Sequence, residues 1–258
     1  MKKLPQITLA FWIMKIAATT LGETGGDLLA QTMNVGYLVS SLILIGLFFI
    51  SLVIQLKAKT FHPVLYWTVI LSTSTAGTTM SDFMNRTAGL GYATGAMVLI
   101  TALAAVFVVW RLSGLTFDVT RIGSFSGEVL YWTAILFSNT LGTSLGDFLA
   151  DSSGLGYAGG ALLISGLLAL TVLAKYRSRI SVTLLFWIAF VLTRPLGATV
   201  GDFFSKPVVK GGLGFGTIGS SLVLLAVLAA LIGHTMRRQR KQAALADRDS
   251  EDPVAATV

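Results

Sequence analysis

Four aspartates stand at equivalent positions of a repeated motif, each inside an apolar stretch of the chain. The motif is Leu-Gly-x-Thr-x-Gly-Asp or a close variant, and its copies end at Asp27, Asp82, Asp147 and Asp202. Ionisable side chains within a membrane are costly, and by default they indicate a functional site. Clustered carboxylates favour protonation of one another, so a cation that binds among them would displace protons. We therefore expect an acidic site for a cation or a proton.

Further oxygen-bearing side chains share the helical face of these aspartates. In an α-helix, the residues three, four, seven and eight positions before an aspartate lie on its side. Carboxylate and hydroxyl oxygens suit hard cations such as Mg²⁺, Ca²⁺ or Mn²⁺. All four aspartates are therefore predicted metal ligands, and the metal is a substrate because no resident cofactor is expected. The neighbouring ion-binding residues that we predict are Glu23, Thr24, Thr78, Thr79, Thr143, Ser144 and Thr199.

Two bases also lie within the apolar stretches, and they are the predicted counter-ions. Lys15 comes about three turns before Asp27, and Arg194 comes about two turns before Asp202. Each either neutralises an acid within the bundle or occupies the site until the substrate arrives. Only two of the four repeats carry such a base, so the repeats are not equivalent. This difference disfavours a symmetric four-site pore.

A tryptophan precedes each aspartate by 15 residues, and an aromatic residue precedes each tryptophan. Tryptophans of membrane proteins are usually interfacial anchors. At this spacing, however, they would lie only about 60° from the aspartate face. They would then converge as a hydrophobic gate. The residues of the predicted gate are Trp12, Trp67, Trp132 and Trp187.

The composition is that of a polytopic membrane protein. Of the 258 residues, 54% are hydrophobic and 12% are charged, against about 25% charged in a soluble domain. The chain has no cysteine, which excludes disulfides and thiolate metal sites. We expect no enzyme, because no Ser-His or His-Glu constellation lies within the apolar stretches. We expect no nucleic-acid partner despite the net charge of +7, because the charges lie in membrane-flanking loops.

Eight stretches are long enough to cross a bilayer, so we predict an all-α fold with eight transmembrane helices. The intervals between the aspartates are 55, 65 and 55 residues, so the halves repeat at 120 residues. Each repeat is then a two-helix hairpin, and all four enter the membrane the same way round as parallel repeats. A single domain is expected over 1–236, and 237–258 is expected to be a disordered cytoplasmic tail. The predicted repeats are 7–56, 61–111, 127–175 and 181–236.

Lysine and arginine are distributed unequally between the two sides of this topology. One side holds 14 of them and the other side holds three, namely Arg86, Lys206 and Lys210. Cytoplasmic loops carry the excess of positive charge. Both termini of this multi-pass protein should therefore be cytoplasmic.

The repeated motifs resemble those of a known family. A leading tryptophan, then Leu-Gly-x-Thr-x-Gly-Asp-Phe-Leu, then Gly-Leu-Gly-Tyr is similar to a group of bacterial "membrane-anchored" proteins with four tandem repeats of unknown function. The resemblance covers 7–236 and implies a bacterial inner-membrane location and eight helices. The first repeat departs from the pattern at Leu28 and Glu23, and the fourth at Arg194 and Pro195. The resemblance implies no activity.

The residues themselves favour a secondary transporter for a small cation. A divalent metal ion of the manganese, magnesium or calcium class, exchanged for protons, is the preferred case. A quasi-four-fold ion channel and a non-transporting scaffold or sensor are the alternatives. The expected partners are the lipid bilayer and a small cation or proton.

Overall fold

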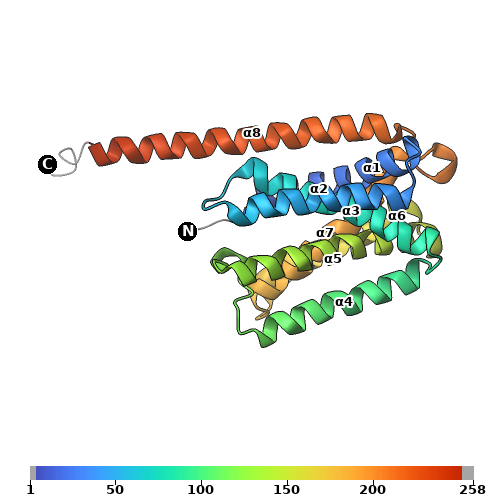
Figure 1. The fold of residues 1–258 in the computed structure, drawn as a ribbon, viewed down its shortest axis with the longest axis horizontal. Helices are drawn as coiled ribbons and strands as arrows, with labels where there is room; N and C mark the ends of the chain where they lie inside the picture. The colour runs from blue at the N-terminus through green and yellow to red at the C-terminus, as the bar shows by residue number, and fades with distance from the viewer. Residues whose placement is uncertain (1–3, 252–258) are drawn as a thin grey trace.

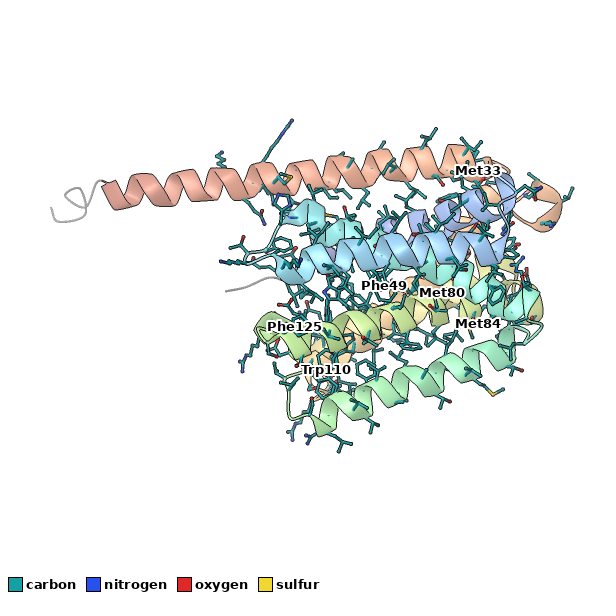
Figure 2. The ribbon with its side chains drawn as sticks, viewed as in Figure 1. Met33, Phe49, Met80, Met84, Trp110 and Phe125 are labelled. Atoms are coloured by element: carbon teal, nitrogen blue, oxygen red, sulfur yellow. The ribbon has the colours of Figure 1, made fainter. Side chains whose placement is uncertain are left out.

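The computed structural model describes residues 4–251, and all the regular secondary structure in this range is helical, with no strand. Consecutive long helices run in opposite directions, so the odd-numbered helices all end at the same end of the bundle (Figure 1). Met33 and Met84 mark this end, whereas Trp110 and Phe125 mark the opposite end (Figure 2). The long helices are α1 (Leu9–Asp27), α2 (Tyr37–Lys57), α3 (Pro63–Asp82), α4 (Tyr92–Leu112), α5 (Phe125–Asp147), α6 (Gly156–Arg177), α7 (Val182–Ser205) and α8 (Gly216–Glu251).

The odd-numbered helices form a closed inner ring. Helix α1 packs against α3, α3 against α5, α5 against α7, and α7 returns to α1. The even-numbered helices lie outside: α2 packs on α3, α4 on α5, α6 on α7 and α8 on α1. Figure 1 shows α4 and α8 on opposite flanks of the inner helices. The outer helices expose large apolar side chains such as Leu42, Leu162 and Leu222, as helices that face lipid do.

Five helices of the described chain are long and apolar enough to cross a membrane, namely α2, α4, α6, α7 and the part of α8 up to Gln239. Several long apolar helices are typical of a membrane protein. The other three predicted spans, α1, α3 and α5, are helices of 19, 20 and 23 residues with a more polar composition. Polar side chains lower the hydropathy of these three helices, and these side chains are buried inside the ring.

Glycines allow the inner helices to approach one another closely. A Cβ placed on Gly77 would lie 3.0 Å from the carbonyl carbon of Asn139, and one on Gly197 would lie 2.8 Å from the carbonyl carbon of Thr19. Gly22 and Gly142 meet Ser74 and Arg194 in the same way. In each pair, a glycine five residues before one aspartate meets the residue eight before the next. The repeated glycines therefore set the spacing of the ring.

Three inner helices end at their aspartate and continue into a π-helical turn. These turns cover Leu28–Thr32, Phe83–Thr87 and Phe148–Ser152. Helix α7 instead continues to Ser205 and is followed by a short 3₁₀ turn at Val208–Lys210. The aspartates therefore lie where the helical geometry changes.

The carboxyl-terminal segment differs from the prediction. Residues 237–251 belong to α8, which extends past the other helices (Figure 1), although the sequence predicts disorder from 237 onward. The segment is rich in Arg, Lys, Gln and Ala, which favour helix, and α8 supplies the nucleus for its extension. Residues 252–258 lie outside the described chain.

Candidate functional site

Stepping by four residues along the inner helices gives successive levels of side chains, about 6 Å apart. Every side chain named here is buried. The acidic level holds Asp27, Asp82, Asp147 and Asp202, and the hydroxyl level, four residues earlier, holds Glu23, Thr78, Thr143 and Ala198. Next come the arginine level (Thr19, Ser74, Asn139, Arg194), the lysine level (Lys15, Ile70, Ile135, Phe190) and the aromatic level (Phe11, Tyr66, Tyr131, Phe186). The interior of the ring is therefore acidic at one end and aromatic at the other.

Two bases join the aspartates in pairs. Arg86 lies 2.9 Å from Asp82 and 3.3 Å from Asp147. Lys206 forms ion pairs with Asp27 and, at 3.4 Å, with Asp202. Each base therefore connects two neighbouring repeats. These partners were missed in the sequence, where both residues count as loop charges; the available signal was their position four residues after an aspartate.

The aspartates keep these two bases charged. Burial lowers the pKa of the Lys206 amine, but the Asp202 and Asp27 carboxylates outweigh it and raise this pKa above its usual value. Burial likewise lowers the pKa of Arg86, whereas Asp82 and Asp147 raise it, with a net increase. Both side chains are therefore positively charged at neutral pH, and a cation that binds to these carboxylates must compete with them.

Three carboxylates from different repeats converge closely enough to hold one metal ion. Glu23, Asp147 and Asp202 each offer an oxygen within 4.8 Å of the other two, and all three are buried. We call these three residues the carboxylate triad. Asp27 and Asp82, which the sequence also predicts as metal ligands, lie outside the triad and are held by Lys206 and Arg86.

Arg194 crosses the ring axis and fills the space above its own level. Its guanidinium lies 3.0 Å from Glu23, donates to Thr78, and donates at 2.8 Å to Thr143. These partners come from α1, α3 and α5. The fourth residue of the hydroxyl level is Ala198, whose small side chain leaves room for the arginine of its own helix. The predicted counter-ion Arg194 thus neutralises Glu23.

Four of the predicted hydroxyl residues do not line the axis. Thr24 accepts a hydrogen bond from Ser221 of α8, and Ser144 bonds to Ser81 and Asn85. Thr79 and Thr199 donate to carbonyl groups of their own helices. Residues three positions before an aspartate therefore lie between helices, whereas those four positions before it face the interior.

Lys15, the other predicted counter-ion, has no described contact with a carboxylate. Its amine lies 3.4 Å from the side-chain oxygen of Asn139 and 4.0 Å from the centre of the Phe190 ring. The side chain is fully buried. Its described partners are therefore an amide oxygen and an aromatic face, and not an acid.

The tryptophans form a cyclic contact at the far end of the ring. Each one packs against the aromatic-level residue of the preceding repeat: the ring centres are 5.6 Å apart for Phe11–Trp67, 5.6 Å for Tyr66–Trp132, 6.0 Å for Tyr131–Trp187 and 5.7 Å for Phe186–Trp12. Trp67, Trp132 and Trp187 are buried, so these three are not exposed to lipid as anchors would be. This location suits a gate, which stays a prediction.

A family model of a repeat of unknown function, DUF347, matches residues 10–61, 65–116, 130–181 and 185–241. The chain belongs to the DUF347 repeat family. Four tandem repeats of unknown function are what the motifs predict, and this prediction is confirmed. Neither the curated proteins nor the solved structures gave a match. Each DUF347 repeat contains one inner helix and one outer helix.

The four DUF347 repeats are equivalent in position but not in chemistry. Their aspartates, glycines and tryptophans repeat, whereas Lys15, Glu23, Ala198 and Arg194 each occur in one repeat. These single residues lie at consecutive levels along the axis. The chemistry of the interior therefore depends on what distinguishes the DUF347 repeats from one another.

Replacing Tyr131 by phenylalanine should lower the free energy of unfolding by about 1–2 kcal/mol. The phenol oxygens of Tyr66 and Tyr131 are 2.7 Å apart and both residues are fully buried, so the change leaves one hydroxyl without its partner. Adding Tyr66→Phe should restore part of the loss, because no unpaired hydroxyl remains. Thermal unfolding of both purified variants checks this, and additive losses would contradict it.

Proposed function

We propose that this chain is a secondary transporter for a small cation, of which a divalent metal ion exchanged for protons is the preferred case. The carboxylate triad carries the proposal, because three buried acids from different repeats offer oxygens within 4.8 Å of one another. Carboxylate oxygens are the ligands of Mg²⁺, Ca²⁺ and Mn²⁺. The hydroxyls of Thr78 and Thr143 lie at the level of Glu23, one level from Asp147 and Asp202.

The proposed topology has eight spans arranged as four parallel hairpins in a bacterial inner membrane. The apolar outer helices would face lipid and the polar inner helices would be enclosed by them, which satisfies the requirement that buried polar groups avoid hydrocarbon. The acidic level would lie near the outer surface. The side richest in lysine and arginine, with both termini, would be cytoplasmic.

Transport by alternating access fits the interior better than a channel does. A channel needs a continuous hydrated path, whereas Arg194, Lys15 and the aromatic level fill the ring interior in succession. The two described pockets lie elsewhere, one between α7 and α8 and the other in the α4–α5 connection. A bound cation would take the place of Arg86 and Lys206 on the carboxylates, and these bases would return when it leaves.

The second candidate function is a non-transporting scaffold. It is favoured by the ion pairs that Arg86 and Lys206 make between neighbouring repeats, since such pairs also hold helices together. In that case the aspartates stabilise the bundle and bind no substrate.

Replacing Asp147 and Asp202 by asparagine together should lower Mn²⁺ uptake into proteoliposomes at least about tenfold, the loss expected when metal-site groups are removed. The matched control is Asp151→Asn, because Asp151 is an exposed carboxylate four residues after Asp147. Uptake of Mg²⁺ and Ca²⁺ should be measured in parallel.

Thermal unfolding of the same variants separates the two functions. A transporter loses uptake while the double variant stays folded. A scaffold loses thermal stability, and its wild type takes up none of the three cations, an outcome that would eliminate the transport proposal.

A further inference from the structure

Lys15 is a fully buried amine that the proposed cation site does not use. It lies at the lysine level, two levels from Glu23 along the same helix. Its described partners are the Asn139 side-chain oxygen at 3.4 Å and the Phe190 ring at 4.0 Å. A buried charge normally requires a paired opposite charge. Lys15 can therefore bind or release a proton without breaking an ion pair.

Other ionisable groups surround Lys15 on the neighbouring helices. Tyr66 of α3 and Tyr131 of α5 lie one level away and bond to each other, and His234 of α8 is exposed. Arg194 of α7 lies one level away on the other side and is the charged group that acts electrostatically on Lys15. Burial disfavours the ammonium form of Lys15 most strongly, and the Arg194 charge disfavours it further to the extent that this charge is not neutralised.

Glu23 is shared between Arg194 and the carboxylate triad. Its Oε2 atom lies 3.0 Å from the guanidinium, and the same carboxylate belongs to the group that can hold a metal ion. A cation bound by Glu23 weakens the neutralisation of Arg194. The exposed arginine charge then repels the ammonium of Lys15 one level below.

We propose that Lys15 is the proton-binding site of the exchanger and that it releases its proton when a cation occupies the carboxylate triad. This inference rests on the proposed function. In the step, the Nζ–H bond of the ammonium breaks, the electron pair stays on nitrogen, and a water molecule accepts the proton when the transport cycle admits water to the lysine level. The positive charge that arrives with the cation is thereby partly balanced by the charge that leaves.

The test measures proton release while Mn²⁺ is titrated into weakly buffered purified protein that contains a pH-sensitive dye. Wild type should release protons on binding. Lys15→Met, which has no titratable group, should still bind Mn²⁺ and release about one proton fewer per bound ion. Lys15→Arg keeps a permanent charge, so it should also release fewer protons and bind Mn²⁺ about tenfold more weakly, a typical coupling between two sites.

Lys175→Met is the matched control, because Lys175 is exposed at the end of α6, and it should release as many protons as wild type. Thermal unfolding shows that each variant is folded. Equal proton release by wild type, Lys15→Met and Lys15→Arg, with Mn²⁺ bound by all three, would overturn the role of Lys15 and leave the proposed function standing. Failure of wild type to bind Mn²⁺, Mg²⁺ or Ca²⁺ would overturn both.

Discussion

Replacing Arg194 by methionine should lower the free energy of unfolding by about 3–5 kcal/mol, the usual cost of removing one partner of a buried ion pair. Glu23 is only 2% exposed and would lose its guanidinium partner. Thr78 and Thr143 would lose a donor from the same side chain. Because these residues belong to α1, α3 and α5, the loss affects the whole inner ring. Thermal or denaturant unfolding of the purified protein measures it.

A second substitution separates the charge from the packing. Adding Glu23→Gln to Arg194→Met should recover part of the stability, because no charge is then left unpaired inside the ring. Arg179→Met is the control, since Arg179 is exposed and its replacement should have little effect. An unfolding curve of Arg194→Met that matches wild type would show that the central ion pair contributes nothing to the ring.

Replacing Gly77 by valine should prevent the inner ring from closing. A Cβ at this position would lie 2.9 Å from the backbone nitrogen of Thr140 and 3.0 Å from the carbonyl carbon of Asn139. Overpacking a core costs about 1–3 kcal/mol when side chains can shift. Here the obstacle is backbone, so α3 and α5 must separate, and we expect a loss at or above that range. Yield of monodisperse protein and its melting temperature provide the measurement.

Gly46→Val is the matched control for this change. Gly46 lies within the outer helix α2, and a Cβ there would meet nothing within 4 Å. The same substitution should therefore leave the melting temperature nearly unchanged. Similar losses in both variants would mean that the helix propensity of valine, and not the close approach of α3 and α5, limits stability.

Much of the fold could be predicted because the repeats share one register. A tryptophan 15 residues and a glycine five residues before each aspartate fix which residues share a level, although the loops between the repeats differ in length. Hydropathy alone was less informative, because the threonines and serines that lower it in α1, α3 and α5 are enclosed by the ring. The closure of α7 onto α1 could not be predicted, since register specifies depth along a helix but not its neighbours.

The candidate site was predictable only in part. Glu23, Thr78 and Thr143 meet around Arg194, whereas Thr24 and Ser144 bond between helices. Positions three and four before an aspartate share a helical face, and only the packing of neighbouring helices decides which of them points inward. The ion pairs of Arg86 and Lys206 with the aspartates were missed because both residues were assigned to loops. A loop position does not show whether a side chain folds back by one helical turn onto the acidic level.

The lone arginine on the axis also bears on how such a ring can be built. Four identical hairpins assembled as a homotetramer would place four guanidinium groups at one height, where their mutual repulsion would force the helices apart. Joining the hairpins in one polypeptide lets each copy diverge, so that a single cation at the centre can face a single glutamate. Covalent fusion is thus the condition that permits this core to be asymmetric.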